Sequence, residues 1–164
     1  FMFDDVKFEN GYDRSSFQID DIELPTNTGR DYDVGNMGHR PRAKGGYFPV
    51  APVDSCVDIR GEMVATMLEM GLPMDKHHHE VAAAQHELGI TFGTLTQTCD
   101  RVQVYKYVVQ QVAHAYGKTA TFMPKPIKDD NCTLYTSDAA DDRHVVNLRV
   151  PRLAATQPLY PLNR

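Results

Sequence analysis

Apolar residues recur at helical spacing in two segments of the chain, and both segments predict amphipathic helices. We expect the first helix to follow Asp54, whose carboxylate can accept hydrogen bonds from the first turn, and to end at Gly71. We expect the second to run from about Thr94 to Tyr116, with Gly117 ending it. The predicted buried stripes are Val57, Val64, Met67 and Leu68 in the first helix and Val102, Tyr105, Val109, Val112 and Tyr116 in the second.

The other patterned segments predict short strands. Residues 1–8 partly alternate between apolar and polar positions, and residues 118–124 form a brief strand pattern after the second helix. Residues 9–46, which are rich in Asp, Gly, Asn and Pro, predict loops and short strands. The order of strands, helix, strands, helix and strand predicts an α+β domain in which two main helices back an antiparallel sheet.

Composition narrows the classes of function. With 164 residues the chain is long enough for one domain with a hydrophobic core. A net charge of −5 argues against a nucleic-acid partner, and no apolar run is long enough to span a bilayer, so we expect no membrane partner. Cys56, Cys99 and Cys132 are far apart and form no CxxC pair, which indicates free thiols and a cytoplasmic protein.

Residues 76–89 carry four histidines and two glutamates within fourteen positions. A purification tag is disfavoured because the histidines lie inside a patterned region. Zinc is disfavoured because a strand sends His77 and His79 to one face and His78 to the other, with neither an HExxH motif nor a nearby cysteine. The simplest interpretation is that these are half-buried strand histidines whose ring nitrogens are hydrogen-bonded.

Glu80 and Glu87 need a further explanation, because small or apolar residues surround both carboxylates and a buried anion is costly without a compensating cation. Their spacing of seven would place them on opposite faces of an unbroken strand. A bend, a bulge or a hairpin through Ala82–Ala84 could bring them together. Two converging carboxylates suit Mg²⁺ or Mn²⁺, with waters and phosphate oxygens completing the shell.

Three long motifs follow one another along the chain: GNMGHRPRAKGGYFPVAPVDS (35–55), HHHEVAAAQHELG (77–89) and VYKYVVQQVAHAYGKTATFMPKP (104–126). In this order they resemble bacterial type I glutamine synthetase, most closely its proteobacterial form. The resemblance covers residues 1–127 and only the opening part of that family's catalytic domain. It implies ATP-dependent ligation of ammonia to L-glutamate through γ-glutamyl phosphate, with Mg²⁺ or Mn²⁺ holding the phosphates.

The resemblance also implies roles for residues near the metal. Glu80 and Glu87 match two carboxylate ligands of the metal site, and Glu80 resembles the residue that helps to receive the ammonium proton. Tyr47, after the Gly45–Gly46 turn, matches a tyrosine that lines the ammonium pocket. The three histidines of residues 77–79 belong to the motif but are not implied as ligands.

A second group of matches concerns ATP and glutamate. Asp75 lies where the family usually has a glutamate that touches the nucleotide, and its shorter side chain would reach less far. Phe92, with Ile90 and Thr91 before it, matches the segment against which adenine packs, although a phenylalanine is also an ordinary core residue. Asn131 matches a glutamate-binding asparagine.

The resemblance ends near residue 131, and we expect residues 128–164 to lie outside the family domain of residues 1–127. Cys132 replaces a glycine, and the histidine, serine, arginine and glutamate positions that the family places further on have no match. Residues 134–142 resemble a translated sequencing adapter, so we expect the tail to be an assembly artefact and disordered. Because Phe1 falls inside a strand pattern, we also expect the natural N-terminus to be missing.

Three functional interpretations therefore stay open. The first is a fragment of glutamine synthetase that is inactive alone, since phosphoryl transfer needs all of its positioned ligands. The second is a metal- or nucleotide-binding module without catalysis. The third is a γ-glutamyl-polyamine ligase of the same superfamily. The resemblance implies a homo-oligomer, a dodecamer of two stacked six-membered rings whose active sites are shared between neighbours.

Overall fold

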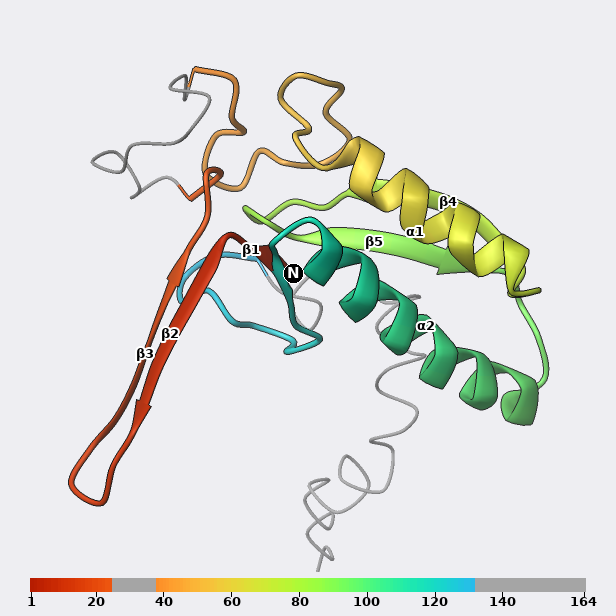
Figure 1. The fold of residues 1–164 in the computed structure, drawn as a ribbon. Coiled ribbons are helices and arrows are strands. Elements are labelled where there is room, and N and C mark those ends of the chain that lie inside the picture. Colours follow the sequence, from red (N-terminus) through yellow and green to blue (C-terminus); the bar gives the residue numbers. More distant parts are fainter. Residues whose placement is uncertain (25–37, 132–164) are drawn as a thin grey trace, which may run out of the picture.

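The computed structural model describes residues 1–24 and 38–131, and in these ranges the chain is an α+β protein (Figure 1). The helices are α1 (Val57–Glu69) and α2 (Leu95–Ala115), and the strands are β1 (Met2–Phe3), β2 (Asp5–Asn10), β3 (Ser15–Asp20), β4 (Met74–His79), β5 (His86–Ile90) and β6 (Thr119–Ala120). The predicted class, the two helices and the antiparallel pairing are confirmed. The described strands form three separate pairs, β1–β6, β2–β3 and β4–β5, where the sequence suggested one sheet.

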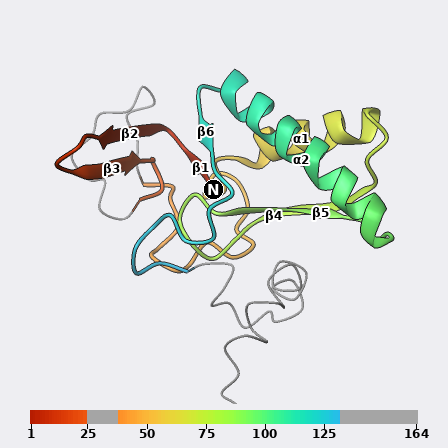
Figure 2. The same ribbon diagram turned by 90° about the horizontal axis from the view of Figure 1, so that it is seen from below.

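Both helices cover the same face of the β4–β5 hairpin, which Figure 2 shows nearly edge-on beneath them. The core lies between these layers and includes Met2 from β1 and Leu88 from β5. The buried members contributed by the helices are Ile59, Met63, Met67, Val108, Val109, Val112 and Ala113. The opposite face of β4 and β5, turned away from the helices, carries polar side chains such as His78 and Glu87.

The buried face of α1 differs from the predicted stripe. Ile59, Met63 and Met67 follow one another at i, i+4 spacing and are almost fully buried, whereas Val57 and Val64 are only partly buried. Leu68, predicted to be buried, is 51% exposed, because it lies one residue, or about 100°, around the helix from Met67. The prediction was wrong for this residue because aliphatic character alone does not identify the buried face.

Helix α2 follows the prediction more closely. It begins after Thr94, whose backbone amide donates to Gln97 Oε1 at 3.3 Å, and Val109 and Val112 are buried as expected. Val102 and Tyr105 are half-buried, again on the core side. At the C-terminus the prediction fails, because Tyr116 is 47% exposed and its hydroxyl donates to Glu62 of α1.

Asp54 does not cap α1 as predicted, because Cys56 occupies the N-cap position. The Asp54 carboxylate instead accepts from the Cys56 amide at 3.2 Å and forms a buried ion pair with Arg60. Burial alone would raise the pKa of Asp54, but the hydrogen bond and charge of Arg60 outweigh it and lower the pKa. Arg60 is 1% exposed and needs this anion, since an unpaired buried charge is strongly unfavourable.

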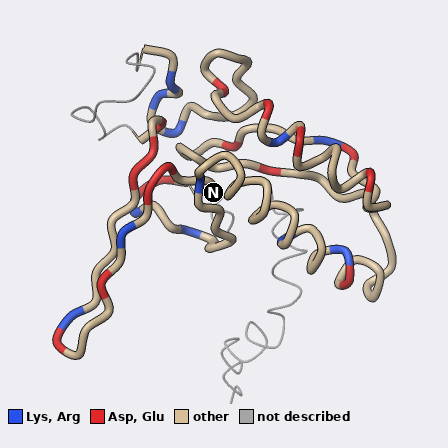
Figure 3. The backbone as a smooth tube through the Cα atoms, in the orientation of Figure 1, with Lys and Arg blue, Asp and Glu red and all other residues tan. Residues whose placement is uncertain are grey.

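The β2–β3 hairpin projects from the rest of the molecule (Figure 1), and acidic and basic residues alternate along its β2 strand (Figure 3). It accounts for part of the segment predicted as loops and short strands. Residues 1–8 contain two strands, and only Thr119–Ala120 of residues 118–124 is strand. No helix among the described residues is long and apolar enough to cross a membrane. The tail prediction falls on residues 132–164, outside the described ranges.

Candidate metal centre

The β4–β5 hairpin brings acidic and histidine side chains to the face that is turned away from the helices. In the antiparallel register His78 lies opposite Glu87, and cross-strand partners share a face. Glu80 follows His78 by two residues and therefore continues on that face. The chain reverses between Glu80 and Gln85, where the Glu80 amide donates to the Gln85 carbonyl at 2.8 Å. Of the alternatives for bringing Glu80 and Glu87 together, the hairpin is the one that the structure contains.

The three side chains converge closely. One ligand atom from each of His78, Glu80 and Glu87 lies within 4.8 Å of the others. His78 Nε2 is 2.9 Å from Glu80 Oε1 and 3.8 Å from Glu87 Oε2. The side chains of these residues are 5%, 15% and 28% exposed, so the cluster lies at the surface end of a mostly buried site.

The donor set fits a divalent cation. Two carboxylates supply the anionic oxygen ligands, and the Lys76 ammonium group lies 3.6 Å from Glu87. The His78 nitrogen that faces both carboxylates is Nε2. Oxygen ligands with one imidazole suit Mg²⁺ or Mn²⁺, and Mn²⁺ accepts the nitrogen more readily.

The segment around Tyr47 lies against the hairpin turn. The Gly46 amide donates to the Val81 carbonyl at 3.1 Å, and the Phe48 amide to the His79 carbonyl at 3.2 Å. A Cβ at Gly46 would lie 2.5 Å from the Glu80 carbonyl oxygen, so this approach requires glycine. The second glycine of the Gly45–Gly46 pair therefore has a packing role beyond a tight turn.

Aromatic rings surround the histidine of the cluster. The Phe48 ring stacks on the His78 imidazole with centroids 4.3 Å apart, and the Tyr47 ring meets it edge-on at 5.8 Å. Tyr47 itself is 57% exposed. The structure thus places the Tyr47 ring beside His78, which belongs to the same cluster as Glu80 and Glu87.

The residues predicted to contact the nucleotide lie at the opposite, open end of the hairpin. Asp75 occupies a bulge in β4, and its carboxylate folds over Gly89, where a Cβ would be 2.1 Å from Asp75 Oδ1. Ile90 pairs with Met74, and Thr91 donates from its amide to the Pro73 carbonyl. Phe92 is 89% exposed. An exposed ring is available for stacking, and a core role for Phe92 is ruled out within the described residues.

Asn131 is the last described residue, and its segment reaches the turn between β4 and β5. The Asp130 carboxylate accepts from the Ala83 amide at 3.4 Å and from the Asn131 amide at 2.8 Å. Asn131 is half-buried. The structure places it near the turn without a direct contact to Glu80 or Glu87.

His77 and His86 have structural roles in the hairpin. His77 Nδ1 accepts from Arg60 Nε at 3.4 Å, and burial together with the Arg60 charge lowers the pKa of His77. His86 Nδ1 accepts from Arg60 Nη1 at 2.9 Å, and burial, with the charges of His79 and Arg60, holds the pKa of His86 well below its usual value. Neutral rings can accept these bonds. The expectation that the ring nitrogens are hydrogen-bonded holds for these two atoms but not for His86 Nε2, which is buried without a partner among the described residues.

Sequence reasoning missed His78 as a member of the cluster. The signal was present, because strand alternation places His78 and Glu80 on one face, but the resemblance assigned the histidines no ligand role. The register with Glu87 was not readable from the sequence, since the length and shape of the turn determine it.

Comparisons with known proteins identify the family. The profile of the glutamine synthetase catalytic domain matches residues 1–135. Glutamine synthetases from Rhizobium meliloti (strain 1021) and Azospirillum brasilense are 61% and 62% identical to the chain over 131 residues, and that of Vibrio cholerae is 61% identical over 132. Each alignment covers 80% of this chain and 28% of the relative, so the chain spans under a third of the proteins that it matches.

The fold agrees with this assignment. A cryo-EM structure of Plasmodium falciparum glutamine synthetase matches with a TM-score of 0.71 and 25% identity, over 80% of this chain and 26% of that one. The match and the identities above rest on the part of the chain that contains both helices and the β4–β5 hairpin. The expected likeness to bacterial type I glutamine synthetases is therefore confirmed, and the chain belongs to the glutamine synthetase catalytic-domain family.

Proposed function

We propose that the chain is a portion of a glutamine synthetase that contributes carboxylate metal ligands to the ATP-dependent ligation of ammonia to L-glutamate. The observation that carries this proposal is the convergence of His78, Glu80 and Glu87 within 4.8 Å on the face of the hairpin turned away from the helices. A bound Mg²⁺ or Mn²⁺ would supply charge neutralisation for phosphate oxygens during formation and displacement of γ-glutamyl phosphate. We further propose a cytoplasmic enzyme that assembles as a dodecamer.

The roles of the chain's own residues follow from their chemistry. Glu80 and Glu87 bind the cation, and Glu80 also receives a proton from ammonium as the amine attacks. Tyr47, beside the cluster, lines the ammonium pocket. The proximity of its ring to His78 supports this role.

The open end of the hairpin is proposed to face ATP. Asp75 contacts the nucleotide, and Phe92, with Ile90 and Thr91, packs against adenine, which the exposure of the Phe92 ring supports. Asn131, carried to the turn by Asp130, binds glutamate. In this proposal residues 1–127 form the partial catalytic domain and residues 128–164 lie outside it.

Titration of the whole 164-residue chain with Mn²⁺, followed by electron paramagnetic resonance, tests the metal role. We expect Glu80→Gln and Glu87→Gln each to weaken Mn²⁺ binding by about tenfold or more, since each removes an anionic ligand without changing shape. Glu9→Gln, which changes an exposed carboxylate on β2, is the matched control. Unchanged binding in both hairpin variants would overturn the proposal.

An activity assay separates the fragment from the binding module. With ATP, glutamate and ammonium we expect no glutamine formation by the chain alone and only weak Mn²⁺ binding, because much of the relatives' length is outside it. Tight, stoichiometric binding that is lost in Glu80→Gln would favour a competent metal-binding module instead.

A further inference from the structure

A buried pair joins the turn that carries Glu80 to a distant part of the chain. Glu23 and His79 are 2% and 1% exposed, and Glu23 Oε2 lies 2.7 Å from His79 Nε2 across 56 positions of sequence. We propose that Glu23 and His79 are positioning residues that set the geometry of the Glu80-bearing turn for metal binding. This inference rests on the proposed metal role of Glu80 and Glu87 and assigns no ligand role to the pair.

The pair holds both arms of the turn at once. Glu23 Oε2 accepts from His79 Nε2 on the outgoing arm and from the Ala84 amide, at 2.8 Å, on the returning arm. His79 Nδ1 donates to the Glu80 carbonyl oxygen at 2.6 Å. Ser55 donates to the other Glu23 oxygen at 2.9 Å. One carboxylate therefore bridges the two ends of the loop whose first residue is Glu80.

Two observations indicate that the Glu23–His79 pair stabilises the turn. Ala84 has φ +56°, a left-handed conformation that costs a non-glycine residue about 1–2 kcal/mol, and its amide is the one that Glu23 accepts from. His79 Cε1 would lie 2.7 Å from a Cβ at Gly46, so the ring also fills the space under the neighbouring segment. Removing Glu23 leaves the Ala84 amide without its acceptor, and removing His79 takes away the bond to the Glu80 carbonyl oxygen.

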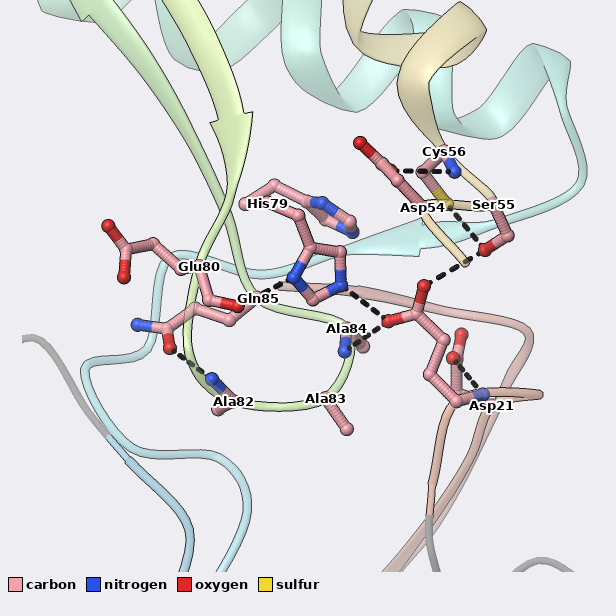
Figure 4. A network of polar contacts seen from close by, with 12 residues as sticks. Asp21, Asp54, Ser55, Cys56, His79, Glu80, Ala82, Ala83, Ala84 and Gln85 are labelled. Atoms are coloured by element: carbon pink, nitrogen blue, oxygen red, sulfur yellow. Dashed lines mark hydrogen bonds and ion pairs between the residues drawn. The ribbon is translucent and has the colours of Figure 1, made fainter. Parts of the chain in front are cut away.

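His79 lies on one face of β4, and the proposed metal-binding side chains lie on the other. Because side chains alternate along β4, His79 points into the molecule while His78 and Glu80 share the other face. Figure 4 shows the His79 ring within the network near Ala84 and the Glu80 side chain leaving on the other side. A shift of His79 would therefore move the backbone of Glu80 directly, without any contact between the pair and the cation.

Ion-pair chemistry agrees with this geometry. Both ring nitrogens of His79 donate, one to the Glu80 carbonyl oxygen and one to the Glu23 carboxylate, which is the pattern of a charged imidazolium paired with an anion. A buried ion pair adds little stability compared with well-packed apolar residues, and its best-attested use is to fix a single arrangement. The arrangement that is fixed here is that of the turn between β4 and β5.

The test compares Glu23→Ala with Glu23→Gln in the whole chain, with Mn²⁺ alone as the probe. We expect Glu23→Ala to weaken Mn²⁺ binding about tenfold or more, as loss of a residue behind a ligand typically does. We expect Glu23→Gln to bind within about threefold of the parent, because its amide oxygen can still accept from both arms. Met67→Ala, a core change away from the turn, should lower thermal stability but leave Mn²⁺ affinity unchanged.

Hydrogen exchange gives a second readout that needs no metal. In Glu23→Ala the Ala84 and Glu80 amides should exchange faster than in Met67→Ala at a matched loss of stability. Should Glu23→Ala not fold, His79→Gln keeps a donor toward Glu23 but loses the bond to Glu80, and should weaken Mn²⁺ binding about fivefold.

Two results are distinguishable. Parent-like Ala84 and Glu80 exchange in Glu23→Ala, or in His79→Gln when the first variant does not fold, would overturn the positioning role whether or not the chain binds Mn²⁺. A parent chain without a Mn²⁺ site that depends on Glu80 would overturn the proposed metal role instead, and the exchange readout would then decide the positioning role by itself.

Discussion

At the scale of single residues, Asp21 gives the fold a dependence on pH. Burial raises the pKa of its carboxyl to about 7, with the charge of Lys118 opposing and those of Asp4 and Glu23 adding to the shift. Between the usual value of 3.8 and about 7 the folded state therefore binds more protons than the unfolded state. The contribution of this group to stability is complete below that window and is lost as pH rises through it, by up to about 1.4 kcal/mol per pH unit.

We expect Asp21→Asn to flatten the decrease in unfolding free energy between pH 5 and pH 7, because the neutral amide does not titrate. Its Oδ1 can still accept from the Glu23 amide, as the carboxylate does at 2.9 Å. Urea unfolding at several pH values measures the slope, and Asp13→Asn on the exposed tip of the β2–β3 hairpin is the control. An unchanged slope in Asp21→Asn would show that another group carries the dependence.

Some residues of the candidate site were predictable from the sequence and others were not. Glu80 and Glu87 were identifiable because charged residues within an apolar stretch need an explanation, and their convergence was predictable once a hairpin was allowed. Glu23 was not identifiable, because its partner is 56 positions away and acidic residues are common in such loops. Local patterns carry information about faces of a strand, whereas distant pairings depend on the tertiary fold.

At the scale of elements, local periodicity predicted the helices, whereas contacts between distant residues were not predictable. Element type and approximate position followed from periodicity, including Thr94 as the start of α2. The start of α1 was misplaced because aspartate is a common N-cap residue. The Asp54 carboxylate instead pairs with Arg60, a buried cation that no helical pattern predicts. The β2–β3 hairpin was partly missed because its strands are exposed and lack an apolar face to bury.

The difference between the observed and expected faces of α1 is measurable. Met63 is 1% exposed, so Met63→Ala should lower the unfolding free energy by about 2–5 kcal/mol through lost packing. Leu68 is 51% exposed, so Leu68→Ala should change it by about 0.5 kcal/mol or less. Urea denaturation of both variants gives the comparison. Equal losses would place Leu68 in the core and restore the face expected from the sequence.

At the scale of the whole molecule, an apolar surface remains on the projecting hairpin. Phe8 and Phe17 are 78% and 65% exposed and lie directly opposite one another in the β2–β3 register, so both rings are on one face. Exposed apolar patches of this kind commonly mark surfaces that contact other protein. The two opposed rings therefore form a candidate contact surface on this hairpin.

We therefore expect the isolated chain to associate with itself through this face, and Phe8→Ser with Phe17→Ser to reduce the association. Because both rings are largely exposed, the double variant should keep the thermal stability of the parent to within a few degrees. Size-exclusion chromatography with light scattering over a range of concentrations measures the mass. Lys7→Ser with Gln18→Ser changes the adjacent cross-strand pair on the opposite face of the same hairpin and should leave association unchanged. If both double variants associate as the parent does, the contact lies elsewhere on the molecule.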